Sequence, residues 1–177
     1  MVIEKEFKFE MAHKLSESYT EKCQHIHGHS YKLRVQLFGE DESSLNDEGV
    51  LVDFTFVKEI VKPYIEKLDH NFMIHAEDKA AEALMAEAHF GRYPIIVCKY
   101  NPTAERICLM LASSIAEEIF RVCPFGITRV GCVVEETETS SASYSILKEA
   151  CKKGSGVVVP PFKLENCCTF ISNQGGE

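Results

Sequence analysis

The sequence contains neither a long hydrophobic run nor a dense basic cluster, and each absence argues against a class of protein. Its uninterrupted apolar stretches are only a few residues long, far short of the roughly 20 that a membrane-spanning helix needs. Acidic residues outnumber basic ones by 27 to 19, giving a formal net charge of −8. This charge disfavours nucleic-acid binding, although a pocket on an acidic protein can still hold a small anion.

The first residues do not resemble a secretory leader, and the cysteine spacing does not indicate a disulfide framework. The first residues carry acids and no apolar core, which predicts a cytoplasmic protein. No Cys-x-x-Cys pair occurs among the eight cysteines, which argues against a thioredoxin-type or zinc-ribbon site. In a reducing compartment we expect free thiols, most of them small core residues.

The length and the hydrophobic pattern predict one α+β domain. At 177 residues, 45% of them hydrophobic and 26% charged, the chain matches an ordinary globular domain. Period-two alternation predicts four strands at 2–11, 27–38, 126–137 and 142–147. Apolar stripes predict helices at 57–68, 77–90 and 101–119, whereas 93–99 is either a strand or an extended link. We expect a four-stranded antiparallel sheet with helices on one face and two open edges that favour association.

Two helix boundaries carry specific expectations. Asp53 is placed to cap the first helix, and Pro63 falls inside it, where we expect a kink or a short break. Asn101 is expected to cap the third helix, with Pro102 in its first turn.

The chemically distinctive stretch is Cys23-Gln-His-Ile-His-Gly-His29. His27 and His29 lie two apart in a predicted strand and therefore project from the same face. In the first strand, His13 lies two residues after the inward-facing Met11 and is therefore expected to point to the same inward face. If the two strands pair as a hairpin, the three imidazoles converge at the loop that joins them. Three neutral imidazoles around one open position are a ligand set for catalytic zinc.

The neighbouring candidates leave alternatives open. Cys23 could be a fourth ligand that closes a structural site, or a base beside the metal whose thiolate the ion favours. Asp69 could orient His70 in a relay that activates the thiol, although a polar helix terminus explains this pair by itself. Glu136 has the inward parity of its strand, but it could equally be a solvated strand end.

Six segments carry motifs in a specific order. They are Phe9-Glu-Met-Ala-His13, Cys23-x3-His27-Gly-His29-Ser-Tyr31, Leu51-Val-Asp-Phe54, Leu68-Asp-His70, Pro102-Thr-x-Glu105 and Glu136-Thr137. In this order they resemble the 6-pyruvoyl-tetrahydropterin synthase family over residues 1 to about 147. The resemblance implies the tunnelling fold, in which the sheets of several monomers join into a barrel and two trimers stack into a homohexamer.

The resemblance also implies roles for the candidate residues. Zinc would be bound by three histidines, His13, His27 and His29. The catalytic relay would join a thiol to a carboxylate–imidazole pair from a neighbouring subunit, Cys23 to Asp69 and His70. The pterin would be held by one main anchor and two further candidates, Glu136, Thr103 and Glu105. The family motif gives no role to His25.

The spacing between the cysteine and His-Gly-His separates the branches of the family. A gap of three residues resembles the bacterial 6-carboxytetrahydropterin synthases of queuosine biosynthesis. That resemblance implies a carbon–carbon lyase that converts 7,8-dihydroneopterin triphosphate to 6-carboxytetrahydropterin, acetaldehyde and triphosphate. The alternative in the same family is 6-pyruvoyl-tetrahydropterin synthase, which eliminates triphosphate. An alternative of another class is a non-enzymatic zinc-binding protein, in which one cysteine and three histidines form a closed zinc site.

Parts of the chain depart from the family pattern. Met73-Ile74 stands where the family commonly has a Leu-Asn or Leu-Asp pair, and the segment 75–100 is longer than in compact members. We therefore expect a catalytic domain at 1–150 with an insertion at about 75–100, followed by a C-terminal extension at 151–177.

Overall fold

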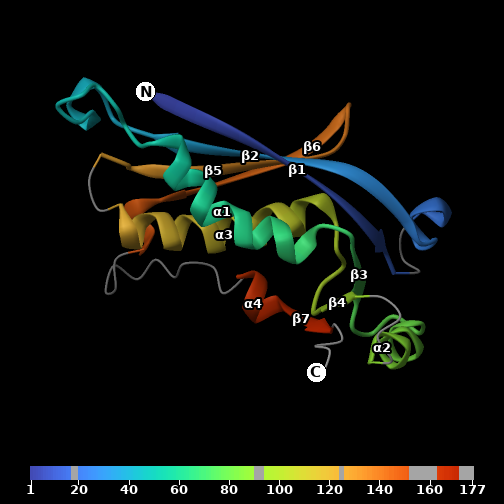
Figure 1. Cartoon of the computed structure of the whole chain (residues 1–177). Coiled ribbons are helices and arrows are strands. Elements are labelled where there is room, and N and C mark those ends of the chain that lie inside the picture. The colour runs from blue at the N-terminus through green and yellow to red at the C-terminus, as the bar shows by residue number, and fades with distance from the viewer. Residues whose placement is uncertain (17–19, 90–93, 124–125, 152–162, 172–177) are drawn as a thin grey trace.

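A computed structural model describes residues 1–16, 20–89, 94–123, 126–151 and 163–171 (Figure 1). Within these ranges one mixed sheet has seven strands in the order β6-β5-β2-β1-β3-β4-β7. The strands are β1 (Val2–Lys14), β2 (His27–Phe38), β3 (Asn71–His75), β4 (Ile95–Cys98), β5 (Arg129–Thr137), β6 (Ser140–Leu147) and β7 (Cys168–Ile171). The expected antiparallel part is present as β1, β2, β5 and β6. The expected total of four strands is wrong, because β3, β4 and β7 extend the sheet beyond β1.

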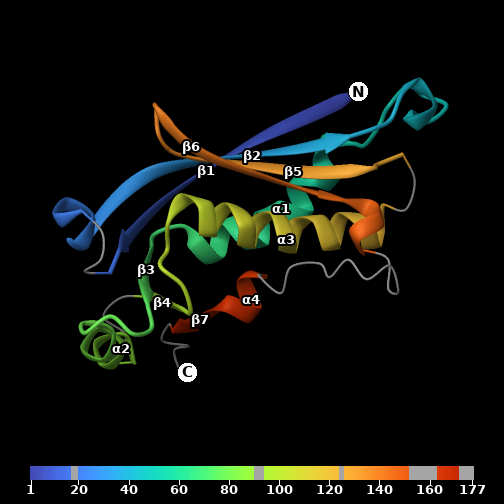
Figure 2. The same cartoon turned by 180° about the vertical axis from the view of Figure 1, so that it is seen from behind.

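Two long helices, α1 and α3, cover one face of the antiparallel part of the sheet (Figure 1, Figure 2). The helices are α1 (Phe54–Leu68), α2 (Ala81–His89), α3 (Ala104–Val122) and α4 (Leu164–Cys167), with short 3-10 turns η1 (Glu21–Gln24), η2 (Glu42–Ser44) and η3 (Lys148–Cys151). Helix α2 lies apart from this layer, on the side of β3 and β4 (Figure 1). None of the described helices is long and apolar enough to cross a membrane.

Alternation along β1 and β2 creates a dry face and a wet face. The two strands pair antiparallel from Val2 opposite Phe38 to His13 opposite His27. On the dry face Phe9 stacks on Tyr31 with ring centroids 5.1 Å apart. Apolar side chains of the two long helices complete this core, among them Val57, Val61, Ile107, Leu111 and Ile115. Each such burial contributes about 1.5–3 kcal/mol, which fixes the register of β1 against β2.

The ends of the helices confirm one expected cap and contradict another. Asp53 accepts a hydrogen bond from the Thr55 backbone N–H (2.6 Å) and caps α1. The helix runs through Pro63 without the expected break, because Pro63 lies on its exposed side, where solvent can reach the freed carbonyl. The cap of α3 is Thr103, whose hydroxyl accepts from the Arg106 N–H (3.4 Å). The expected cap by Asn101 is therefore wrong.

On the side away from β2, strand β1 pairs with another strand over only a short part of its length. Strand β3 pairs in parallel with Met11 to Lys14. Residues 2–9 of β1 have no second neighbouring strand within the described part of the chain. Strand β6 forms the edge at the other end of the sheet. The antiparallel part thus presents two long open edges, which proteins usually cover.

The segment 75–100 and the C-terminal segment meet in this sheet. Strand β4 pairs in parallel with β3, and β7 pairs antiparallel with β4, with Cys98 opposite Cys168. The Sγ atoms of these two buried cysteines are 2.6 Å apart. Residues 152–162 and 172–177 of the expected extension lie outside the described residues. The described part of that extension therefore contributes a strand to the same sheet.

Candidate metal and catalytic site

Three imidazoles come together at the end of the dry face of β1 and β2. His27 lies directly opposite His13, and His29 is two residues further along the same face of β2. One ligating nitrogen from each ring falls within 4.8 Å of the others. The ring centroids are 4.4 to 5.2 Å apart. This spacing lets one ion contact all three rings.

Backbone carbonyls turn two of these rings toward the centre of the cluster. His13 donates its Nδ1–H to the Pro102 carbonyl (2.7 Å), and His27 donates its Nδ1–H to the His25 carbonyl (2.7 Å). A carbonyl can only accept, so each neutral ring carries its proton on Nδ1 and a lone pair on Nε2. The two Nε2 atoms are 2.9 Å apart. Two lone pairs at this distance repel unless a cation lies between them, so the residues present fit a bound metal ion.

Burial favours the neutral form that a metal requires. His13 is 1% exposed, and its burial lowers the pKa of the imidazole. Burial also lowers the pKa of His29, against the opposing effect of the nearby Glu136 carboxylate. A neutral imidazole keeps the lone pair that binds a metal, so the environment prepares both rings as ligands.

Glu136 lies beside the cluster because it continues the inward parity of Val130, Cys132 and Val134 along β5. The pairing of β5 with β6 shifts register between Glu135 and Thr137, and Glu136 is the residue at the bulge. Its Oε1 atom is 3.7 Å from His13 Nε2. The Tyr31 hydroxyl donates to the same oxygen (3.4 Å), and burial raises the pKa of Tyr31, so this hydroxyl stays protonated. A carboxylate is thus fixed at the rim of the site, able to accept from N–H groups of a ligand.

Cys23 lies outside the cluster of ligating atoms. It belongs to η1, where the Thr20 hydroxyl donates to its Sγ atom (3.2 Å). Its carbonyl accepts from the Leu15 N–H (3.0 Å), which ties η1 to the end of β1. Among the described residues, the group of ligating atoms within 4.8 Å of one another contains the three histidines and no sulfur. The described geometry thus leaves the thiol available for a role other than ligation.

Asp69 and His70 share a face because of an uncommon backbone turn. His70 has a φ of 57°, a left-handed value that few non-glycine residues adopt. This turn brings Asp69 Oδ2 within 3.0 Å of His70 Nδ1. The Glu10 N–H donates to Asp69 Oδ1 (2.8 Å), and the His70 N–H donates to the Glu10 carbonyl (2.6 Å). The bond from Glu10 lowers the pKa of Asp69, so an ionised carboxylate orients the imidazole.

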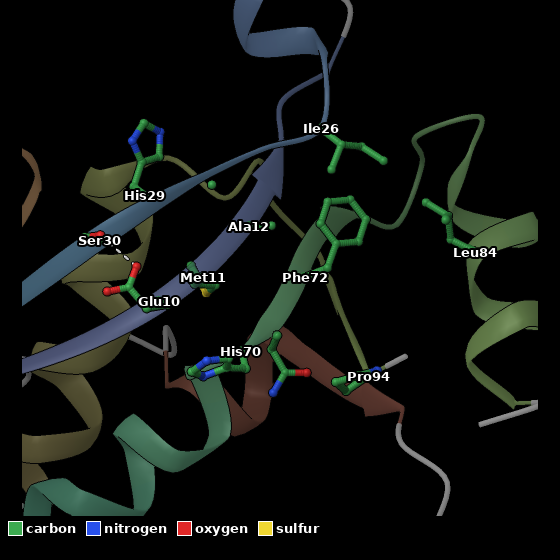
Figure 3. Close-up of a pocket in the computed structure, with 12 residues that line it drawn as sticks. Glu10, Met11, Ala12, Ile26, His29, Ser30, His70, Phe72, Leu84 and Pro94 are labelled. Atoms are coloured by element: carbon green, nitrogen blue, oxygen red, sulfur yellow. Dashed lines mark hydrogen bonds between the residues drawn. The ribbon is translucent and has the colours of Figure 1, made fainter. Parts of the chain in front are cut away.

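His70 lines an open groove on the surface. The groove has a volume of about 600 Å³, and its lining includes Glu10, Ser30, His70, Phe72 and Leu84 (Figure 3). The His70 side chain is 79% exposed. Within the described residues, the hydrogen bonds of the Asp69–His70 pair include those to Glu10 and none to the histidine cluster, although His29 lines the same groove as His70. One groove thus borders both parts of the predicted site within a single chain.

Thr103 and Glu105 lie near the cluster through the segment that carries them. The hydroxyl of Thr103 caps α3, and Glu105 is exposed in the first turn of that helix. The residue before Thr103 is Pro102, whose carbonyl orients His13. The structure thus places this segment beside the metal ligands, and the described contacts of the two side chains do not include the histidines.

Sequence reasoning missed several groups that shape the site. The carbonyls of His25 and Pro102 and the backbone of Glu10 act through atoms that every residue carries, so no side-chain type marks them. Tyr31 could have been found, because it lies on the inward parity of β2 two residues after His29.

Comparisons with known proteins agree with this architecture. The family model described as 6-pyruvoyl tetrahydropterin synthase matches residues 2–146. The chain is 32% identical to a 6-carboxy-5,6,7,8-tetrahydropterin synthase of Rickettsia bellii over 70% of its length and 86% of that protein. It is 31% identical to the Aquifex aeolicus protein of the same name, over 80% of this chain and 96% of the relative.

Solved structures show the same fold at lower identity. An uncharacterised Wolinella succinogenes protein aligns with a TM-score of 0.63 at 20% identity, covering 83% of this chain and 97% of that one. The 6-pyruvoyl tetrahydropterin synthase of Plasmodium vivax aligns with a TM-score of 0.60 at 18% identity, covering 83% and 99%. By its match to the family model over most of its length, the chain belongs to the 6-pyruvoyl tetrahydropterin synthase family.

Proposed function

We propose that this chain is a zinc-dependent 6-carboxy-5,6,7,8-tetrahydropterin synthase. The reaction converts 7,8-dihydroneopterin triphosphate and water to 6-carboxytetrahydropterin, acetaldehyde and triphosphate, as a carbon–carbon lyase step in queuosine biosynthesis. The observation that carries the proposal is the inward-facing histidine cluster, in a chain whose bacterial relatives bear that enzyme name. A cytoplasmic location is part of the proposal.

The histidine cluster would hold the zinc ion through His13, His27 and His29. The bound ion would act as a Lewis acid toward the side-chain hydroxyls of the substrate. Glu136 would accept hydrogen bonds from the N–H groups of the pterin ring and so orient the side chain toward the cluster. Thr103 and Glu105, at the start of α3, are the further candidates for substrate contact.

Proton transfer would fall to Cys23 and His70. Cys23, outside the cluster but tied to the end of β1, would act as the base toward the substrate side chain. Asp69 holds His70 through Nδ1, which leaves Nε2 to exchange a proton. The carboxylate thus keeps one tautomer of the imidazole in place.

A complete site would require neighbouring subunits. Cys23 and the Asp69–His70 pair have no described contact within one chain, so the relay would form between two chains. Residues 2–9 of β1 and strand β6 provide the open edges along which the sheets could join into a barrel. We propose a homohexamer, a dimer of trimers, with its active sites between subunits.

The experiment combines a metal assay with product identification. Purified protein containing about one zinc per chain, incubated with 7,8-dihydroneopterin triphosphate, is expected to yield carboxytetrahydropterin and acetaldehyde. Formation of a pyruvoyl product alone would instead assign the triphosphate-eliminating activity. A protein that holds zinc and forms neither product would favour a non-enzymatic role.

A Cys23→Ala variant decides between the base and the ligand roles of the thiol. The lyase proposal expects zinc to be retained and turnover to be lost, whereas a closed structural site expects zinc to be lost. Cys123→Ala is the matched control, because Cys123 is also half-buried but lies at the far end of α3. It is expected to change neither zinc content nor turnover.

A further inference from the structure

We infer that Asn101 is a positioning residue that sets the place of the Cys23 thiol relative to the metal ligands. The inference rests on the proposed function in so far as it concerns turnover. Asn101 Oδ1 accepts from the Ser16 N–H (2.9 Å), and its Nδ2 donates to the Ser16 hydroxyl (2.8 Å). One side chain thus uses both of its polar atoms to hold a residue 85 positions away.

The contact continues from Ser16 to the thiol. The neighbouring Leu15 is 6% exposed, and its N–H donates to the Cys23 carbonyl (3.0 Å). The Thr20 hydroxyl then donates to Cys23 Sγ (3.2 Å) and favours one orientation of the side chain. Because Leu15 and Ser16 are consecutive, a displacement of Ser16 moves the backbone on which η1 depends.

The next residue holds the metal ligand from the same segment. The Pro102 carbonyl accepts from His13 Nδ1 (2.7 Å). Asn101 and Pro102 therefore fasten both ends of the stretch from His13 to Ser16. This arrangement fixes the distance between a ligand of the ion and the turn that carries the thiol, which is the distance that a proton transfer depends on.

The side chain of Asn101 is free for this role because another residue caps the helix. Thr103 caps α3, so Asn101 is not needed at that position. The Pro102 carbonyl cannot be removed by substitution, whereas the Asn101 amide can. Substitution of Asn101 therefore tests whether its two bonds to Ser16 position the thiol, without changing a metal ligand or the thiol itself.

Three variants separate positioning from general stabilisation. Asn101→Ala removes both hydrogen bonds to Ser16. Asn101→Asp keeps the acceptor of the Ser16 N–H and reverses the second bond, because the Ser16 hydroxyl would then donate to the carboxylate. Ser16→Ala removes only the hydroxyl bond and is the milder variant if Asn101→Ala folds poorly. Asn46→Ala is the matched control, because Asn46 also accepts two backbone bonds, from Glu48 and Val50, in a loop far along the chain.

The readouts are zinc content, kcat, KM and the rate at which iodoacetamide alkylates Cys23 as a function of pH, with the modified peptide identified by mass spectrometry. For Asn101→Ala we expect retained zinc, a KM changed by less than about threefold, and a kcat lowered on the order of 10- to 100-fold. Alkylation of Cys23 is expected to be several-fold faster, because the turn that half-buries it is released. Ser16→Ala should fall between wild type and Asn101→Ala, and Asn101→Asp should be close to wild type.

Several results would overturn the inference. They are an alkylation rate unchanged in both Asn101→Ala and Ser16→Ala, an Asn101→Asp variant as impaired as Asn101→Ala, or an equal effect in Asn46→Ala. Loss of zinc in parallel with kcat would also overturn it and assign Asn101 a structural role. Alkylation does not depend on turnover, so the placement of Cys23 remains testable even if the wild-type protein shows no lyase activity and the proposed function fails.

Discussion

Replacing Asp69 by asparagine tests the relay without removing the turn that holds it. Asparagine keeps an oxygen that can accept from the Glu10 N–H, so the backbone contact at 2.8 Å can persist. Its amide nitrogen cannot accept from His70 Nδ1, the contact now at 3.0 Å. The substitution therefore removes the orientation of one imidazole and little else.

The expected cost is large for turnover and small for stability. A positioned acid–base group contributes roughly 10²- to 10⁴-fold to a rate, so kcat should fall within that range. The Asp69–His70 pair is largely exposed, with side chains 38% and 79% accessible, so its loss should cost at most about 1 kcal/mol of unfolding free energy. For a domain of this size, that corresponds to a melting temperature lowered by about 2–4 °C or less.

The pH profile adds a second test. The bond from Glu10 lowers the pKa of Asp69 in the folded protein. The carboxylate is therefore ionised, and its contribution to stability and orientation is present, above the ordinary Asp pKa and is lost as the pH falls through the lowered value. In Asp69→Asn this acid limb of the kcat profile should be absent, while zinc content stays at the wild-type level.

The measurement is steady-state turnover of Asp69→Asn, His70→Ala and the double variant, with zinc content and melting temperature. If the two residues act as one unit, the double variant should be no worse than the poorer single variant. Wild-type kcat in Asp69→Asn, or simple multiplication of the two losses, would refute the relay.

Three further predictions concern other parts of the molecule. His29→Ala should lower the zinc content to well below one per chain, measured by atomic absorption after gel filtration, because two nitrogen ligands do not complete the site. Tyr31→Phe should raise KM more than it lowers kcat and cost about 0.5–1.5 kcal/mol in urea unfolding, because Glu136 loses its hydroxyl donor. Treatment with a diazene dicarboxamide oxidant should join Cys98 to Cys168, which face each other across β4 and β7, and remove two thiols per chain in a mass assay; Cys98→Ser should abolish this loss.

The two longest strands were predictable because their signal is local. Alternation along β1 and β2 gave their faces, and parity then led from Met11 to His13. The short strands had no such signal. All four residues of β4 are buried, as are Met73 and Ile74 of β3, so period-two alternation is missing. Strand β7 pairs with β4 across about 70 positions, a contact that no local window contains.

Within the site, the side chains were predictable and their supports were not. The sequence analysis placed the cap of α3 at Asn101 and the structure places it at Thr103, because Asn-Pro-Thr contains two residues of types that can cap a helix. The left-handed turn at His70 is held by two hydrogen bonds to the backbone of Glu10, which lies 60 positions earlier in the chain. One comes from the Glu10 N–H to the Asp69 carboxylate, and the other goes from the His70 N–H to the Glu10 carbonyl. Such contacts depend on the folded arrangement of distant segments.

The two bonds that Glu10 makes to Asp69 and His70 also limit how another chain can approach. On the side of β1 that faces away from β2, the N–H and the carbonyl of Glu10 are both occupied. In the proposed hexamer, a strand from a second subunit could therefore pair along residues 2–9 and would end before Glu10. The Asp69–His70 pair would thus set the last register position of that pairing between chains. The interface in the proposed hexamer would then end beside His70, the imidazole that a neighbouring site would need.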